Sequence, residues 1–88
     1  MDIAQRLKEI IIKITMQDIN IDNINASTIL TTDLGYNSVQ IIELIVELEN
    51  EFNIEIDDDD LDIENLTVFN KLHEMVRRKQ NNKEDTWL

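Results

Sequence analysis

Ser38 is the residue of this sequence whose type and position best suit a chemical role. It follows Gly35, the only glycine in the chain, and it precedes an apolar stretch with helical spacing that begins at Val39. A single glycine before such a stretch indicates a backbone turn that a side chain would obstruct. The Ser38 hydroxyl should therefore lie at the start of a helix, where free N–H groups and the helix dipole favour negative charge. These residues leave two interpretations open: a simple helix cap, or the attachment point of a negatively charged group.

The aspartate run at residues 57–60 suggests a calcium site, but its spacing does not fit a binding loop. An EF-hand loop needs glycine at its sixth position and glutamate at its twelfth. Counted from Asp58, these positions hold Ile63 and Phe69, and a start at Asp57 fails in the same way. We therefore expect no dedicated metal site. Loose binding of divalent ions that relieves repulsion among the acids stays open.

The remaining residues do not assemble into an active site. His73 is the only histidine, and the chain has no cysteine and no glycine-rich phosphate loop. A chain of 88 residues has room for a single modest core and for no deep pocket. We predict that the protein has no catalytic residue and is not an enzyme.

Apolar residues recur at helical spacing in three segments, which we expect to be the main helices of an all-α fold: residues 2–16, 38–52 and 67–79. Thr67 is expected to cap the last of them. The residues expected to face the core are Ile3, Leu7, Ile10, Ile11, Ile14, Ile41, Leu44, Ile45, Leu48, Phe52, Val68, Leu72, Met75 and Val76.

The segments between these helices are expected to be irregular. Residues 17–25 alternate in part like a strand, but a lone strand would have no partner, so we favour a long loop over residues 17–37. A short helical turn is expected at about residues 58–63, inside the connector 53–66. Residues 80–88 are expected to form a polar, disordered tail.

The charge of the chain is strongly acidic and unevenly distributed. Nineteen acidic residues against eight basic ones give a net charge of −11, and no Lys or Arg lies between Lys13 and Lys71. Nucleic acids and anionic membranes bind basic surfaces, so we exclude both as partners. Basic protein surfaces are the expected partners, with association that salt weakens. Without a secretory signal or an apolar run near ~20 residues, the sequence predicts a cytoplasmic protein, which we expect to be a monomer.

Helix 38–52 carries two features on its outer side. Val39, Ile42 and Val46 form a narrow apolar line beside several glutamates, and the helix has no basic residue at i±4 to them. Like charges at that spacing cost about 0.2–0.5 kcal/mol per pair, so a helix selected only for stability would mix signs. We therefore prefer a docking helix to a merely solvated acidic face.

The sequence resembles the acyl carrier protein family, including its peptidyl and aminoacyl carriers, from Ile3 to about Val76. Asp33-Leu34-Gly35-Tyr36-Asn37-Ser38-Val39 is similar to the family's D-L-G-x-D-S-L signature. Residues 48–56, L-E-N-E-F-N-I-E-I, resemble its L-E-x-E-F-x-x-x-I continuation, and Leu66-Thr67-Val68 resembles the start of its last helix. All three fragments occur in order and at the right separations.

This resemblance implies a four-helix bundle with a long first loop and a short third helix, in which residues 1–79 form the carrier domain. It implies that Ser38 carries 4′-phosphopantetheine, added from coenzyme A by a phosphopantetheinyl transferase, and that acyl groups ride on the terminal thiol as thioesters. The other expected partners are an acyl-loading ligase or transferase, a synthase, and further pathway enzymes with basic docking surfaces. The residues expected to meet them are Asn37, Val39, Ile42, Glu43, Val46, Glu47 and Glu49.

The expected function is that of a stand-alone acyl carrier in fatty-acid, polyketide or related biosynthesis. Four positions differ from the usual fatty-acid carrier: Asn37 replaces Asp, Val39 replaces Leu as a mild change, Gln40 stands where an acid is frequent, and Asp57 stands where Pro is common. The first alternative is therefore an aminoacyl or peptidyl carrier of a nonribosomal peptide or other specialised pathway. The alternative from another class is an unmodified acidic helical adaptor, in which Ser38 is only a cap.

Overall fold

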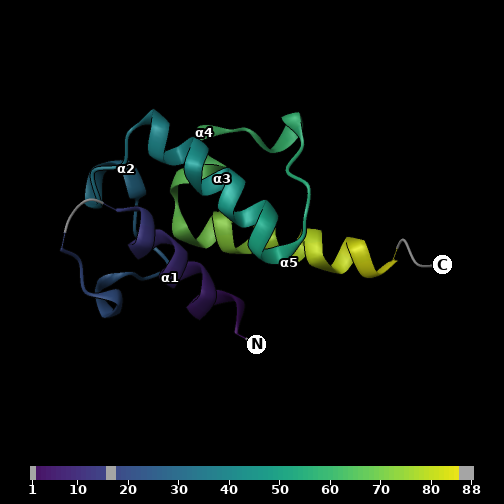
Figure 1. Cartoon of the computed structure of the whole chain (residues 1–88), viewed down its shortest axis with the longest axis horizontal. Helices are drawn as coiled ribbons and strands as arrows, with labels where there is room; N and C mark the ends of the chain where they lie inside the picture. The colour runs from purple at the N-terminus through teal and green to yellow at the C-terminus, as the bar shows by residue number, and fades with distance from the viewer. Residues whose placement is uncertain (1, 16–17, 86–88) are drawn as a thin grey trace.

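The computed structural model describes residues 2–15 and 18–85 of the chain, with residues 82–85 described by their backbone alone. The elements within these residues are α1 (Ile3–Ile14), η1 (Ile21–Asn23), α2 (Leu30–Asp33), α3 (Ser38–Phe52), η2 (Asp58–Asp60), α4 (Ile63–Thr67) and α5 (Phe69–Asp85). In this described part α1, α3 and α5 are the long helices; α1 and α3 lie side by side, and both contact α5 (Figure 1). The expected all-α fold is confirmed.

The core is formed by the inner faces of the long helices together with side chains from the first loop. Most of the residues expected to face the core are buried, while Ile3, Ile41, Ile45 and Val68 are only half-buried. The buried hydrophobic residues are Leu7, Ile10, Ile11, Ile14, Ile24, Leu30, Leu34, Tyr36, Leu44, Leu48, Phe52, Ile54, Leu66, Phe69, Leu72, Met75 and Val76. This burial supplies the main driving force for holding the loop against the helices.

The first loop contains more regular structure than the sequence indicated. The prediction that this segment is not a strand is confirmed for the described residues 18–37. The only strand-like feature among them is an isolated antiparallel bridge between Ile29 and Val68. The expectation of a loop without helix was wrong, because α2 forms one turn, with Asp33 Oδ2 accepting a hydrogen bond from Ile29 N–H at 2.8 Å. A helix of four residues is too short to produce a periodic apolar pattern.

The start of the last helix differs from the prediction as well. Thr67 does not cap it; Thr67 is the last residue of α4, and its Oγ1 donates a hydrogen bond to the Ile63 carbonyl at 2.6 Å. The N–H groups that begin α5 are satisfied by the first loop instead. Phe69 N–H donates to the Thr28 carbonyl at 2.9 Å, and the next residue donates to the Ala26 carbonyl. A distant loop thus takes the place of a local capping side chain.

The far end of α5 extends past the expected end of the helix at residue 79. The helix continues to Asp85 and projects beyond the other elements (Figure 1). The domain boundary at residue 79 and the disordered tail 80–88 remain predictions, and residues 86–88 lie outside the described residues. None of the described helices is both long and apolar enough to cross a membrane.

The connector after α3 is tied to α5 by ion pairs. The helical turn expected near residues 58–63 is the 3-10 turn η2, whose Asp60 pairs with Lys79 at 2.6 Å and with Arg78 at 2.8 Å. Burial alone would raise the pKa of Asp60, but the hydrogen bonds and charges of its partners outweigh it and lower that pKa below its usual value. This cluster holds the aspartate run against α5.

Candidate functional site

Ser38 is the first residue of α3, and its side chain is exposed. The cap of the helix is Asn37, whose Oδ1 accepts a hydrogen bond from Gln40 N–H at 2.9 Å, while Gln40 Oε1 accepts one from Asn37 N–H at 2.9 Å. Such a capping box satisfies two N–H groups reciprocally. Among the described residues, the Ser38 hydroxyl makes no hydrogen bond. The interpretation of Ser38 as the helix cap is therefore wrong, and its hydroxyl is accessible.

The electrostatic surroundings of Ser38 suit a negatively charged group. α3 is 15 residues long, and its first turn contains no acidic side chain. The positive end of the helix dipole is therefore not neutralised by a carboxylate of that turn. An anion linked to the Ser38 hydroxyl would meet the N-terminal N–H groups of a long helix.

The turn before Ser38 has the backbone conformation expected from the sequence. Gly35 has a φ of 71°, in the left-handed region that a Cβ atom disfavours. Just after it, Tyr36 N–H donates to the Leu30 carbonyl at 3.0 Å, so the chain reverses as α2 ends. The glycine thus allows the sharp turn that brings Ser38 to the mouth of α3.

Two side chains flanking Ser38 attach this turn to the end of α1. The Tyr36 hydroxyl donates to the Ile11 carbonyl at 2.8 Å, and Gln40 Nε2 donates to the Ile14 carbonyl at 3.2 Å. Both side chains are buried, and both acceptors belong to the last turn of α1, where the Ile11 carbonyl also accepts the Thr15 N–H at 3.0 Å. Burial, with a smaller contribution from the charge of Glu43, raises the pKa of Tyr36 above its usual value. Hydrogen bonds from the residues before and after Ser38 therefore fix its position relative to the end of α1.

Sequence reasoning did not identify Tyr36 and Gln40 as residues that position the site. One signal was present for Gln40, which lies four residues before Leu44 and eight before Leu48, on the buried face of α3. A polar residue at such a position must find hydrogen-bond partners inside the fold. Tyr36 offered no comparable periodic signal, because it lies outside the helix.

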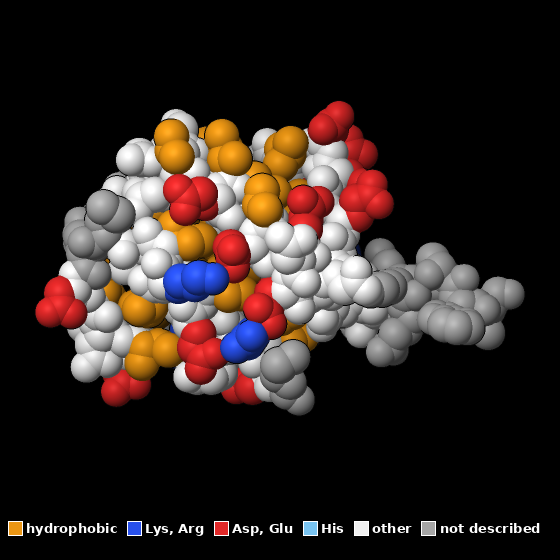
Figure 2. Space-filling view, in the orientation of Figure 1, with side chains coloured by type: hydrophobic (Ala, Val, Ile, Leu, Met, Phe, Trp, Pro, Cys, Tyr) orange, Lys and Arg blue, Asp and Glu red, His pale blue; other side chains and the backbone are white. Residues whose placement is uncertain are grey.

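The apolar residues expected to face partners are exposed. The exposed fractions are 63% for Val39, 61% for Ile42 and 49% for Val46. Hydrophobic side chains gather over α3 and the segment leading to α4 (Figure 2). Glu43 and Asn37 are also exposed, although Asn37 serves as the cap at the same time. Five of the expected docking residues are therefore exposed, from the cap of α3 to the middle of that helix.

The other two expected docking residues are engaged within the molecule. Glu47 pairs with Lys13 of α1 at 3.3 Å. Glu49 accepts a hydrogen bond from Ile56 N–H at 3.0 Å, through its Oε2. The absence of basic neighbours along α3 did not reveal these contacts, because both partners come from other segments. Docking through any of the seven residues stays a prediction.

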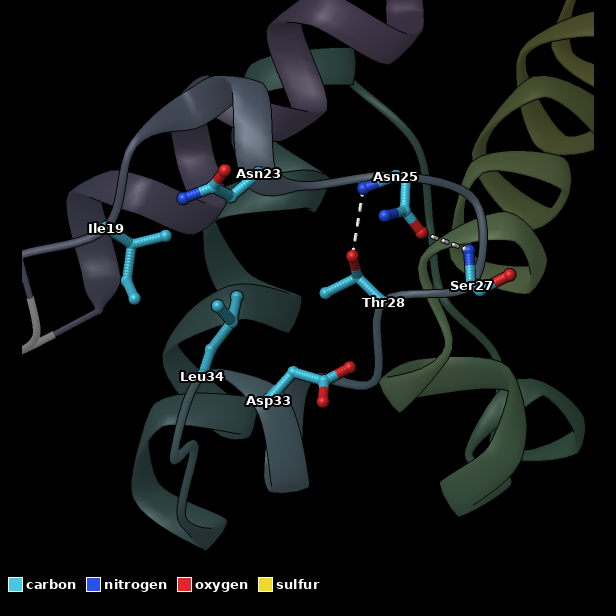
Figure 3. Close-up of a pocket in the computed structure, with 7 residues that line it drawn as sticks. All are labelled: Ile19, Asn23, Asn25, Ser27, Thr28, Asp33 and Leu34. Atoms are coloured by element: carbon cyan, nitrogen blue, oxygen red, sulfur yellow. Dashed lines mark hydrogen bonds between the residues drawn. The ribbon is translucent and has the colours of Figure 1, made fainter.

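A polar hollow of about 440 Å³ lies between the first loop and α2 (Figure 3). The side chains of Asn25 and Thr28 are engaged in the turns of the loop: Asn25 N–H donates to Thr28 Oγ1 at 2.8 Å, and Ser27 N–H donates to Asn25 Oδ1 at 2.9 Å. Asp33 also lines it and is bonded to Ile29, as described above. The hollow includes none of the expected site residues, and its shape follows from the loop turns. Its lining residues are Ile19, Asn23, Asn25, Ser27, Thr28, Asp33 and Leu34.

The acidic residues do not assemble into a metal centre in the described part of the chain. No group of three or more His, Asp or Glu side chains there is placed to hold an ion. In the aspartate run, Asp57 and Asp60 are directed to the cations of α5.

Comparison with known proteins gives a consistent result. The family described as "Phosphopantetheine attachment site" matches residues 5–75. The chain is 34% identical over 79 residues to the acyl carrier protein of Desulforapulum autotrophicum, which covers 90% of this chain and 99% of that relative. It is 38% identical over 58 residues to the acyl carrier protein of Chlorobium phaeobacteroides, covering 66% and 72%. A third relative, the acyl carrier protein of Buchnera aphidicola, is 34% identical over 76 residues, covering 84% and 95%.

Proposed function

The chain belongs to the acyl carrier protein family, and we propose that Ser38 is the residue to which its 4′-phosphopantetheine arm is attached. The family's phosphopantetheine attachment domain covers most of the chain. In the proposed step, a phosphopantetheinyl transferase breaks the pyrophosphate bond of coenzyme A and joins the pantetheine phosphate to Ser38 Oγ. The adenosine bisphosphate leaves, and the serine proton passes to a base of the transferase or to water.

One observation carries this assignment. The Ser38 hydroxyl lies exposed at the start of α3 with no hydrogen bond among the described residues, because Asn37 provides the cap. The first turn of α3 carries no acid that would repel the phosphodiester. The only other serine, Ser27, lies in the first loop and does not itself begin a helix, and the carbonyls of its neighbours Ala26 and Thr28 already accept the first N–H groups of α5.

The family consists of non-catalytic carriers, so the chemistry is that of the arm and of the enzymes it visits. When bound, the arm supplies a terminal thiol, which this cysteine-free chain does not itself contain. We propose a stand-alone carrier that holds acyl intermediates as thioesters in fatty-acid, polyketide or related biosynthesis. The relatives named acyl carrier protein, at 34–38% identity, support that choice. A cytoplasmic location belongs to the same proposal.

An aminoacyl or peptidyl carrier is the second candidate. It is favoured by the neutral residues Asn37 and Gln40, which stand where a fatty-acid carrier usually has acids. The unmodified adaptor loses support, because Ser38 has no capping role that would explain its presence. The proposed partners are the transferase, a loading ligase or transferase, and the synthases or related enzymes of the pathway.

Intact mass spectrometry tests the attachment directly. The purified chain, incubated with coenzyme A and a broad-specificity phosphopantetheinyl transferase, should gain the mass of one phosphopantetheine. Ser38→Ala should gain nothing, while Ser27→Ala should be modified like the wild type. No gain in the wild type, under conditions that modify a control carrier, would refute the proposal. A gain in Ser38→Ala would place the arm elsewhere.

A further inference from the structure

We propose that the polar hollow between the first loop and α2 is a binding site for the phosphopantetheine arm, which occupies it when no enzyme holds the arm. The ligand class is a neutral, amide-rich chain that is tethered at Ser38. This inference rests on the proposed function, because it concerns the arm that Ser38 would carry. It gives the first loop a binding role in addition to its part in the core.

The hollow has an apolar side and a polar side. In Figure 3 the side chains of Ile19 and Leu34 lie on one side, and those of Asn25, Thr28 and Asp33 lie on the other. A pantetheine chain has the same two characters, with a pair of methyl groups near its phosphate and two amide groups farther along. Apolar side chains combined with a few polar groups are typical of small-molecule sites. The lining therefore suits the arm in kind.

Some polar atoms of the hollow have no hydrogen-bond partner among the described residues. Asn25 Oδ1 accepts from the loop, but the amide nitrogen of the same side chain donates to none of these residues, and the Asn23 side chain makes no hydrogen bond with them either. Asp33 uses Oδ2 for the Ile29 N–H and keeps its second oxygen. Two amide donors and a carboxylate acceptor match the carbonyl and N–H groups of the arm.

The charge of the hollow excludes other classes of small ligand. Asp33 is the one charged residue in its described lining, which contains no Lys or Arg. A free anion, such as a nucleotide, would meet only repulsion there. A metal ion would lack ligands, since no group of three or more His, Asp or Glu side chains in the described part of the chain is placed to hold one. A neutral chain remains, and the arm is neutral beyond its phosphodiester.

The attachment at Ser38 makes weak contacts sufficient. Leu34 precedes Ser38 by four residues, which span at most about 14 Å when extended. The turn at Gly35 shortens this distance, and the extended arm is longer than it. A short flexible tether gives an effective concentration of about 1 mM, so contacts that would hold free pantetheine with a Kd of about 1 mM keep about half of the arms docked.

NMR spectra of the full isotope-labelled chain, recorded before and after the transferase adds the arm, test the site. The methyl groups of the arm should give nuclear Overhauser effects to those of Ile19 and Leu34. Away from the residues next to Ser38, the largest changes in amide shift should fall on Asn23, Asn25 and Leu34. Overhauser effects to another element, or shift changes confined to the neighbours of Ser38, would overturn the inference. Neither readout depends on turnover by pathway enzymes.

Asn23→Asp and Asn25→Asp test the two free donors. Each replaces the amide nitrogen by an oxygen of similar size, and Asn25→Asp keeps the acceptor for Ser27 N–H. The loss of one hydrogen bond should lower the ratio of docked to free arm about fivefold, seen as weaker Overhauser effects. Asn50→Asp, an equal change of charge at an exposed position of α3, is the control and should leave them unchanged.

Equal losses in Asn25→Asp and Asn50→Asp would also overturn the inference, because charge alone would then displace the arm. Failure of the proposed function is recognised separately, since the wild type itself would then gain no mass from the transferase.

Discussion

Asn37 and Gln40 cap one another across the first turn of α3, each side-chain oxygen accepting the other's backbone N–H at 2.9 Å. Gln40 also reaches the Ile14 carbonyl with its amide nitrogen. The residue between them that bears the exposed hydroxyl, Ser38, is thereby left free of a structural role. Stability and modification should therefore depend on different residues of the same turn.

The first prediction separates these roles by stability. Ser38→Ala should change the free energy of unfolding by less than about 0.5 kcal/mol, because no hydrogen bond of the described residues is lost. Asn37→Ala should cost about 1 kcal/mol, because the N–H of Gln40 loses its acceptor. Urea unfolding monitored by circular dichroism gives both values. A larger loss for Ser38→Ala than for Asn37→Ala would contradict the assignment of the cap.

Gln40→Glu tests the connection between α3 and α1. The substitution keeps an acceptor for Asn37 N–H but removes the donor to the Ile14 carbonyl and buries a carboxylate at the negative end of α1. We expect a loss of about 1–3 kcal/mol at neutral pH, in line with an unsatisfied buried group. Part of the loss should return on acidification, since a protonated carboxyl can donate. Gln40→Glu with wild-type stability at neutral pH would argue against this contact.

Tyr36 should make the fold sensitive to alkali. Its pKa is raised in the folded state, mainly by burial, so the folded protein holds the phenol proton more tightly than the unfolded chain. The contribution of this buried phenol to the free energy of unfolding is complete below the pKa of tyrosine in the unfolded chain, about 10. It is lost as the pH rises above that pKa. Melting temperatures between neutral and alkaline pH should fall more steeply for the wild type than for Tyr36→Phe. Because Tyr36 is the only tyrosine, its titration can also be followed by absorbance.

Tyr36→Phe should itself cost about 1 kcal/mol at neutral pH, because the Ile11 carbonyl loses one of its two donors and keeps only the Thr15 N–H. An ordinary tyrosine titration, with its midpoint at about 10, would contradict the buried contact.

The cluster of Asp60 with Lys79 should make the connector sensitive to acid. The pKa of Asp60 is lowered in the folded state. Its contribution to the free energy of unfolding is therefore present above the pKa of aspartate in the unfolded chain, about 3.9, and is lost as the pH falls below that pKa. Lys79→Met should cost about 1–3 kcal/mol at neutral pH, because it leaves a largely buried carboxylate with one cation fewer. It should also flatten the dependence of stability on pH in this acidic window. Lys71→Met, which breaks an exposed pair, is the control and should stay within about 0.5 kcal/mol.

The excess of negative charge predicts stabilisation by cations. With a net charge of −11, added Mg²⁺ or moderate NaCl should raise Tm by roughly 5 °C, through relief of repulsion among the acids. Differential scanning fluorimetry at matched ionic strength distinguishes screening from loose divalent binding, since only the latter favours Mg²⁺. A Tm that stays constant or falls would show that self-repulsion does not limit stability.

Local sequence was sufficient where one continuous segment carries the whole signal. The bounds of α3, Ser38 to Phe52, agree with those expected from its apolar spacing, and Gly35 has the positive φ that its place before a helix indicated. Both follow from short-range backbone preferences and from the burial of one helix face. The family could also be recognised from the residues around Ser38, because carriers share the chemistry of that turn.

Contacts between distant segments decided the rest. Local preference made Ser38 a plausible cap of α3 and Thr67 a plausible cap of α5. In the structure Asn37 caps α3, and carbonyls of the first loop accept the first N–H groups of α5. Repulsion along α3 suggested an entirely acidic face, yet Lys13 and Arg6 of α1 lie against it. A sequence pattern reports the neighbours of a residue along its own helix, whereas pairing across helices depends on where each helix ends and how they pack. The sequence alone thus singled out Ser38 as the candidate residue and predicted its helix, and the tertiary structure decided which neighbours hold that serine in place.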